Sequence, residues 1–226
     1  MLKSSLEGGP VDHLLFFPKP IIGVDEVGRG CLAGNVYAAA VILDDKYIPT
    51  GLADSKALSA KRREVLSKQI WEHHQVGLGI ATVEEIEELN ILQASLLAMQ
   101  RAVQALMGQA ALVANAADRG GSGHVLVDGV FKIPDLKGFF QTTIIQGDSR
   151  AMPIAAASIV AKVARDQEML RLDQVHPQYE FAKHKGYSTL LHKENIKKYG
   201  PCPLHRRTFA GVKEYVTSKA NQGKMG

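Results

Sequence analysis

Four acidic residues stand where short apolar runs end, and they are the side chains most able to do chemistry in this chain: Asp25, Glu26, Asp128 and Asp148. Such runs are typical of buried strands, and a carboxylate at the edge of a core is costly unless it has a partner. Carboxylates that converge repel one another and favour a cation, and Mg²⁺ and Mn²⁺ prefer carboxylate oxygen ligands. Two such ions can activate a water and stabilise the leaving oxygen of a phosphodiester.

Each acid taken by itself has a structural alternative. Asp128 precedes Gly129 and suits a turn, and Asp148 equally suits the N-terminus of a helix. The adjacent pair Asp25 and Glu26 directly follows an apolar run and has no such structural need. The metal-site hypothesis therefore depends on the four acids as a set.

A glycine-rich turn, Gly28-Arg29-Gly30, comes two residues after the acidic pair. Glycines let a backbone approach a ligand closely, and backbone N–H and C=O groups can then contact a sugar hydroxyl. The 2′-hydroxyl both donates and accepts, and proteins use it to tell RNA from DNA. Arg29 suits a phosphate contact. By itself the turn is also compatible with an ordinary loop.

The elements that must position these residues alternate between strand and helix. Apolar runs predict five strands, at residues 21–25, 36–43, 76–81, 124–127 and 139–145. Because the first three come nearly consecutively, we predict an α/β fold whose mixed sheet begins as an antiparallel meander, gains parallel strands later and is flanked by helices.

Helical patterns cover residues 59–74, 83–90, 91–117, 151–172 and 190–199. In the first of them we place Val65, Ile70 and Trp71 on the buried face. The Met and Leu stripe of residues 91–107 is expected to be core or a packing surface.

The composition is that of an ordinary globular protein of 226 residues, with 46% hydrophobic residues and a net charge of +4. A basic balance suits a polyanionic partner but is weak evidence alone. The two cysteines, Cys31 and Cys202, form no disulfide framework or zinc site, and no apolar stretch is long enough for a membrane span. We expect a cytoplasmic monomer with no membrane association.

Motifs along nearly the whole chain resemble those of the ribonuclease HII family. They are Asp25-Glu26-Val27-Gly28-Arg29-Gly30, Asp54-Ser55-Lys56, Val127-Asp128-Gly129, Gly147-Asp148, Ile154-Ala155-Ala156-Ala157-Ser158, His184-Lys185-Gly186-Tyr187 and His205-Arg206-Arg207. The family usually has proline where Cys31 and Asn35 stand. The resemblance implies a ribonuclease H-like mixed five-stranded sheet flanked by helices, with a flexible lead-in (1–19), a catalytic domain (20–174) and a C-terminal helical, substrate-binding extension (175–226).

The resemblance also implies the roles of site residues. The catalytic residues would be Asp25, Glu26, Asp128 and Asp148, the first three also metal ligands, and the substrate-binding residues Gly28, Arg29, Gly30, Lys56 and Tyr187. The glycine-rich turn would read the 2′-hydroxyl at an RNA–DNA junction, and the tyrosine would stack on the neighbouring deoxyribose. The expected reaction, with Mn²⁺ or Mg²⁺, hydrolyses the RNA strand of RNA–DNA hybrids or cuts 5′ to single ribonucleotides in duplex DNA, leaving 5′-phosphate and 3′-hydroxyl ends.

Two other functions stay open. Ribonuclease HIII shares the fold and the Gly-Arg-Gly turn but carries an added N-terminal domain, whereas only about 20 residues precede the first predicted strand here. A nucleic-acid-binding module without catalysis is the second, and it would need one of the acids to be missing.

Basic residues near these motifs are candidates to neutralise phosphates, with a solvated surface as the alternative for any one of them. They are Lys56, Lys162, Arg165, Lys183 and Lys185. For His205-Arg206-Arg207 a phosphate contact, helix capping and contact with acids elsewhere are all open.

Overall fold

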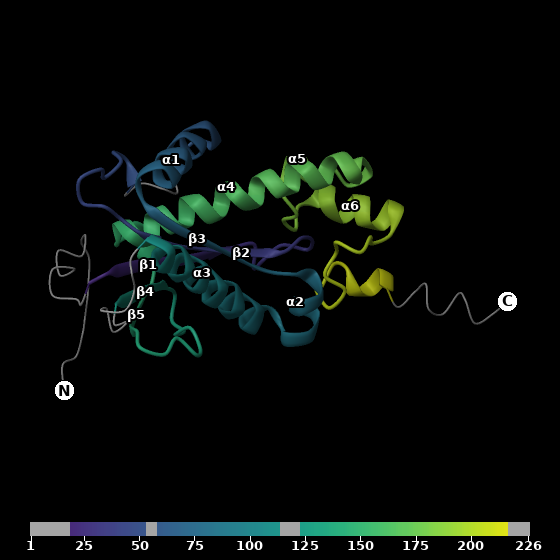
Figure 1. Ribbon diagram of the computed structural model, residues 1–226. Coiled ribbons are helices and arrows are strands. Elements are labelled where there is room, and N and C mark those ends of the chain that lie inside the picture. The colour runs from purple at the N-terminus through teal and green to yellow at the C-terminus, as the bar shows by residue number, and fades with distance from the viewer. Residues whose placement is uncertain (1–18, 53–57, 114–122, 217–226) are drawn as a thin grey trace.

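In the computed structural model the chain forms a five-stranded sheet with helices on both faces (Figure 1). The structure describes residues 19–52, 58–113 and 123–216. The strands are β1 (Ile21–Val27), β2 (Val36–Ile42), β3 (Gln75–Ala81), β4 (His124–Asp128) and β5 (Phe140–Ile144). Their order across the sheet is β3-β2-β1-β4-β5.

The sheet is mixed, as the sequence predicts. β1, β2 and β3 form an antiparallel meander, whereas β4 pairs parallel to β1 and β5 parallel to β4. The carboxyl ends of β1, β4 and β5 therefore meet at one edge of the sheet. In open sheets with parallel strands this edge is where ligands bind.

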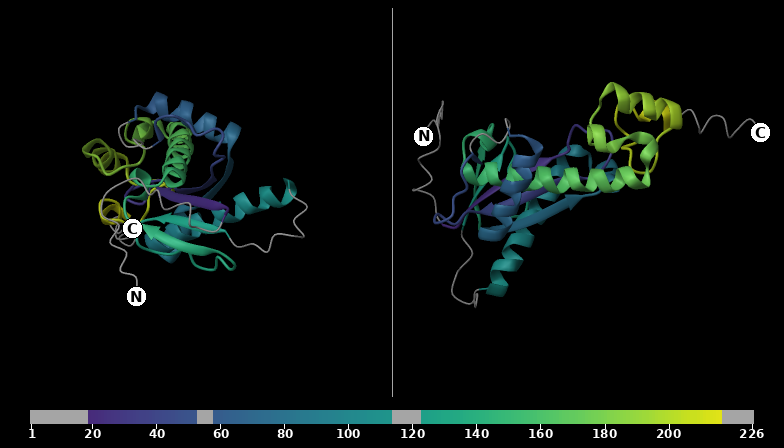
Figure 2. Two further views of the ribbon diagram at one scale, coloured as in Figure 1. Left: turned by 90° about the vertical axis from the view of Figure 1, so that its left-hand side faces the viewer. Right: turned by 90° about the horizontal axis from the view of Figure 1, so that it is seen from above.

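The helices are α1 (Ala60–His73), α2 (Val83–Leu89), α3 (Ile91–Val113), α4 (Met152–Val175), α5 (Phe181–His184) and α6 (Leu190–Tyr199). α3 packs on one face, and α1 and α4 pack on the other, as the views of Figure 2 show. The last residues of the helix expected at 91–117, from 114 on, lie outside the described residues.

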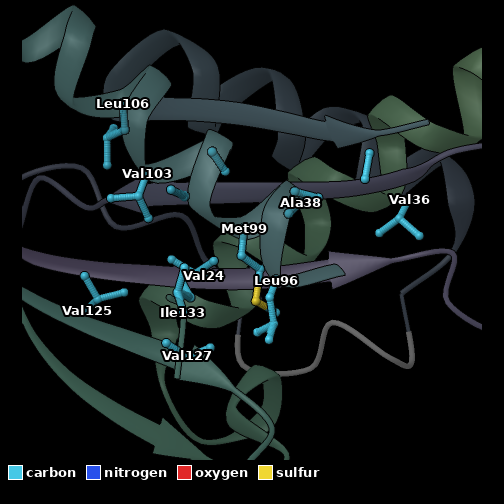
Figure 3. Packing of buried hydrophobic residues seen from close by; sticks show 14 of the residues in the cluster. Val24, Val36, Ala38, Leu96, Met99, Val103, Leu106, Val125, Val127 and Ile133 are labelled. Carbon is cyan, nitrogen blue, oxygen red and sulfur yellow. The ribbon is translucent and has the colours of Figure 1, made fainter. Parts of the chain in front are cut away.

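The main core lies between α3 and the sheet, where Leu96, Met99 and Val103 pack over Val24 and Val125 (Figure 3). The Met and Leu stripe of α3 is thus core, as expected. α3 follows α2 directly, and α2 begins with a capping box in which the Thr82 and Glu85 side chains each accept a backbone N–H.

The predicted inner face of α1 is partly wrong. Ile70 is buried, but Val65 and Trp71 are 42% and 47% exposed. The buried positions of α1 are Leu66, Ser67 and Ile70, and Leu66 and Ile70, which are four residues apart, lie one above the other on the helix. Val65 and Trp71 flank this row, and because α1 lies at the outside of the molecule its buried stripe is narrow.

The residues after α4 form a small helical extension at one end of that helix (Figure 2). Tyr179 and Phe181 pack against Met169 and Leu172 of α4, and Ala33 from the loop after β1 joins them. The extension therefore rests on the segment that carries the glycine-rich turn. The boundary expected at residue 174 falls one residue before the end of α4, and the expected lead-in, except for residue 19, lies outside the described residues.

None of the helices within the described ranges is both long enough and apolar enough to cross a membrane.

Candidate active site

The structure brings the predicted acids together at the carboxyl edge of the parallel strands. Asp25 and Glu26 lie in β1, Asp128 ends β4, and Asp148 lies in a 3₁₀ turn between β5 and α4. Val24 pairs with Val127, so Asp25 and Asp128 stand at the next position of neighbouring strands. The Gly147 N–H donates to Asp128 Oδ1 at 2.6 Å and ties the turn that carries Asp148 to β4.

Negative charge at this edge is poorly solvated. Burial raises the pKa of Asp25 well above its ordinary value, and the nearby carboxylates of Glu26 and Asp128 raise it further. Burial also raises the pKa of Glu26, against the opposing effect of Arg29, whose Nη1 lies 3.2 Å from Glu26 Oε1. Asp25, Glu26 and Asp128 thus oppose one another's ionisation, as expected for a site that is completed by a cation.

The donor set fits a divalent cation in its chemistry. Within the described residues no three His, Cys, Asp or Glu side chains already form a metal-binding group, and Asp128 and Glu26 are turned to Gly147 and Arg29. However, Glu26 Oε2 is buried without a hydrogen-bond partner. A buried carboxylate oxygen that has no donor, beside an acid destabilised by like charges, is what a hard cation would neutralise.

Glu26 lies between two clefts. One, of about 240 Å³, is lined by Asp148, Ser158 and the basic residues Arg63 and Lys162 as well as Glu26. The other, of about 280 Å³, is lined by Glu26, Arg29, Asp128 and mainly apolar side chains. An anionic chain that enters the first cleft would meet positive charge from Arg63 and Lys162 in the same space as the acids.

The two glycines of the Gly28-Arg29-Gly30 turn differ in what they do. Gly28 has φ of 101°, and a Cβ there would collide with the Arg165 guanidinium. A Cβ on Gly30 would meet nothing within 4 Å. Gly28 is therefore required by the fold, whereas Gly30 leaves an open backbone surface beside the acids.

Tyr187 lies close to this turn. It forms an isolated β-bridge with Cys31, the residue is 38% exposed, and Lys162 Nζ lies 5.2 Å from its ring centroid. Lys162 also pairs with Asp166 at 2.7 Å. The ring is thus available to a ligand beside the glycine-rich turn. Lys56, the other predicted substrate contact, lies outside the described residues.

Two hydrogen bonds hold the loop at the positions where the family usually has proline. The Cys31 N–H donates to Gly28 O at 3.3 Å, which a proline nitrogen cannot do. The Asn35 side chain accepts the backbone N–H of Val83, the first residue of α2, at 3.1 Å. These two contacts anchor the loop after Gly30 to the turn before it and to the start of α2.

Arg165 is not a phosphate contact, contrary to the sequence-based expectation. It is fully buried, and its Nε, Nη1 and Nη2 donate to the carbonyl oxygens of Asn35, Lys185 and Ala33. It thereby joins the loop after Gly30 to the turn that carries Tyr187. The sequence does carry a signal of this burial. Arg165 belongs to a row of residues spaced by four along α4 whose other members are small or apolar and buried: Ala157, Ala161 and Met169.

Arg206, in the extension, also holds the loop after β1 through buried hydrogen bonds to backbone carbonyls. It is fully buried, its Nε and Nη2 donate to Gly34 O, and its Nη1 donates to Arg29 O at 2.8 Å. Its neighbour Arg207 is exposed and pairs with Glu87 at 2.9 Å. Three roles were left open for His205-Arg206-Arg207. Arg207 contacts an acid elsewhere in the chain, and the hypothesis of a phosphate contact by Arg206 is wrong.

The chain is similar in sequence to proteins of one known family. The ribonuclease HII family model matches residues 22–212. The ribonuclease HII of Bordetella avium is 50% identical over 199 residues, which cover 88% of this chain and 92% of that protein.

Solved structures show the same fold. The ribonuclease H2 of Pyrococcus horikoshii superposes with a TM-score of 0.61 at 25% identity, over 88% of this chain and 97% of that one. Bst-RNase HIII in complex with Mn²⁺ superposes with a TM-score of 0.68 at 18% identity, over 89% of this chain and 70% of that one. With a family model that spans most of its length and a relative half identical to it, the chain belongs to the ribonuclease HII family.

Proposed function

We propose that this chain is an endonuclease that hydrolyses the RNA strand of RNA–DNA hybrids and cuts duplex DNA 5′ to a single embedded ribonucleotide. The products are 5′-phosphate and 3′-hydroxyl ends. The observation that carries the proposal is the convergence of Asp25, Glu26 and Asp128 at the sheet edge, directly beside an open glycine-rich turn. Membership of the ribonuclease HII family supports it. We expect it to work as a cytoplasmic monomer.

The acids hold divalent cations in this proposal. Asp25, Glu26 and Asp128 would be the ligands, and Asp148 lines the adjoining cleft with Lys162. The chemistry that two such cations supply is activation of a water and stabilisation of the leaving oxygen. Both Mn²⁺ and Mg²⁺ suit carboxylate oxygens, and Bst-RNase HIII, which shares the fold, has been solved with Mn²⁺.

The chain itself provides the selection for RNA. The backbone of Gly28-Arg29-Gly30 contacts the 2′-hydroxyl, and Arg29 and Lys56 contact phosphates. The Tyr187 ring stacks on the deoxyribose that follows the ribonucleotide. Lys162, which lies between the acidic cleft and the Tyr187 ring, offsets the charge of the scissile strand.

Replacing Gly30 by alanine separates recognition from folding. Because a Cβ at Gly30 meets no protein atom within 4 Å, we expect the Gly30→Ala protein to melt at the wild-type temperature. The same methyl would stand between the backbone and the ribose, so KM for a duplex with one ribonucleotide should rise by about tenfold or more, the equivalent of a lost hydrogen bond. Calorimetry and steady-state kinetics measure the two effects. An unchanged KM would contradict the role of this turn.

The function is tested with three duplexes of one sequence: a single embedded ribonucleotide, a tract of RNA paired with DNA, and DNA alone. With Mn²⁺ or Mg²⁺ we expect cleavage 5′ to the single ribonucleotide, cleavage within the RNA tract, and none of the all-DNA duplex. Cleavage of the RNA tract alone would favour the ribonuclease HIII type. Binding of the first two duplexes without cleavage would favour a module that lacks catalysis.

A further inference from the structure

Three buried histidines lie in the extension beneath the turn Lys185-Gly186-Tyr187. His184, His192 and His205 are at most 6% exposed. The rings of His184 and His192 stack with centroids 4.1 Å apart, and Nε2 of His192 lies 3.1 Å from Nε2 of His205. The proposed function gives these three buried imidazoles no role.

Backbone groups decide which nitrogen of each ring carries the proton. The Cys202 N–H donates to Nδ1 of His205 at 3.0 Å, so in a neutral ring Nε2 of His205 bears the hydrogen. That hydrogen points to Nε2 of His192, which must accept it. Nδ1 of His192 then bears a hydrogen and donates to the carbonyl oxygen of Tyr187 at 2.9 Å.

His184 is fixed in the same manner. The Gly186 N–H donates to its Nδ1 at 3.2 Å, and its Nε2 donates to Tyr179 O at 2.9 Å. All three rings are therefore neutral and each has one defined tautomer. If His192 or His205 took up a second proton, two N–H donors would face each other within the chain of hydrogen bonds. Burial lowers the pKa of His192 to about 4 and that of His205 to about 3.

The chain of hydrogen bonds ends on the segment that meets the substrate. Tyr187 O accepts from His192 and also from the Thr189 N–H at 2.8 Å, and Gly186 N–H is held by His184. Gly186 O in turn accepts the Leu32 N–H at 2.8 Å, in the loop after Gly30. The backbone of Gly186 and Tyr187, from which the tyrosine ring projects, is thus held by the imidazoles on one side and by the loop after Gly30 on the other.

These histidines do not form a metal site. Each of the hydrogen bonds above occupies one of their ring nitrogens, and no group of three metal-binding side chains exists among the described residues. A neutral, directional chain fits a role in fixing geometry instead.

We propose that His205 and His192 are positioning residues, which act through the Tyr187 carbonyl to hold the tyrosine ring against the deoxyribose next to the scissile ribonucleotide. The inference rests on the proposed function of Tyr187. It assigns a task in substrate binding to side chains that do not themselves touch substrate.

The tautomers are measured on the wild-type protein by two-bond ¹H–¹⁵N correlation spectra of the histidine rings at pH 7. We expect the proton on Nδ1 in His192, the less common tautomer in water, and on Nε2 in His205 and His184. Proton placement on Nε2 in both His192 and His205 would overturn the chain. This measurement needs no variant to fold.

Steady-state kinetics on a duplex with one ribonucleotide test whether His192 positions Tyr187 for substrate binding. His192→Phe keeps a ring but loses both hydrogen bonds, so KM should rise about tenfold while kcat changes less than about twofold. His192→Asn keeps a donor near the position of Nδ1 and should restore KM to within about threefold. His124→Asn is the matched control, because His124 is also buried but begins β4, at the opposite end of that strand from Asp128, and KM should not change.

A double-mutant cycle separates the two possible failures. Tyr187→Ala alone should raise KM, and His192→Phe should add little in that background, because both changes remove one interaction. Additive effects on KM would overturn the positioning role while the function of Tyr187 stands. No effect of Tyr187→Ala on KM would show that the proposed function of Tyr187 itself is wrong, and the positioning role would fall with it.

Discussion

Asp25→Asn is expected to lower the rate of hydrolysis at least about a thousandfold, a loss of about 4 kcal/mol in transition-state stabilisation, and to make the metal-free protein more stable. The asparagine side chain would keep the acceptor for the Glu26 N–H, which donates to Asp25 Oδ1 at 2.7 Å, but would remove a buried charge beside Glu26 and Asp128. The folded-state pKa of Asp25 is raised, so its contribution to stability is present at low pH and is lost as the pH rises through that value.

At neutral pH Asp25 therefore destabilises the metal-free protein, and its replacement should raise the melting temperature by about 2 to 4 °C for each kcal/mol relieved. Added Mg²⁺ or Mn²⁺ should stabilise the wild type more than the variant. Glu72→Gln, which changes an exposed acid on α1 that pairs with Lys68 at 3.8 Å, should change neither quantity. Full hydrolytic rate in Asp25→Asn would refute the catalytic assignment.

Arg206→Met is expected to cost both stability and catalysis. It leaves the carbonyl oxygens of Gly34 and Arg29 without their donors, and each buried unsatisfied group costs about 1 to 3 kcal/mol. The melting temperature should fall by roughly 5 to 10 °C. Because the loop from Arg29 to Gly34 loses its anchor, kcat/KM should fall by about a hundredfold, the scale of a misplaced contact group.

The neighbouring arginine provides the control. Arg207→Met removes an exposed ion pair with Glu87, so the melting temperature should change by less than about 2 °C and kcat/KM should stay as in the wild type. Thermal unfolding and steady-state kinetics on both variants distinguish a buried anchor from surface charge. Equal effects of the two substitutions would mean that burial of Arg206 has no special consequence.

The sheet was predictable because its signals are local. The run from Ile21 and the run from Val36 are separated by too few residues for a crossover, which requires the antiparallel pairing seen between β1 and β2. The capping box at Thr82 and Glu85 likewise predicted the start of α2. The four acids could be predicted as site residues because three of them lie inside or at the end of strands, and the fourth follows β5 in a tight 3₁₀ turn.

What the sequence could not reveal depends on partners far along the chain. Arg206 resembles surface charge in the sequence, whereas the spacing of apolar residues along α4 places Arg165 on the inner face of that helix. For neither arginine does a pattern of neighbouring residues show that its partners are backbone carbonyls 130 and 172 residues away. The burial and the hydrogen bonds of His192 are hidden from the sequence for the same reason. Its hydrogen bonds to Tyr187 and His205 exist only after the extension has folded onto itself.

The bond from Arg206 to Arg29 O, across 177 residues, sets an order of events during protein synthesis. At about 5 to 20 residues per second, a ribosome needs roughly 10 to 35 s to make the segment between them. Asp25, Glu26, Asp128 and Asp148 are all translated before that interval ends. All four acids are therefore already made when Arg206, the last anchor of the loop that follows them, is added to the chain.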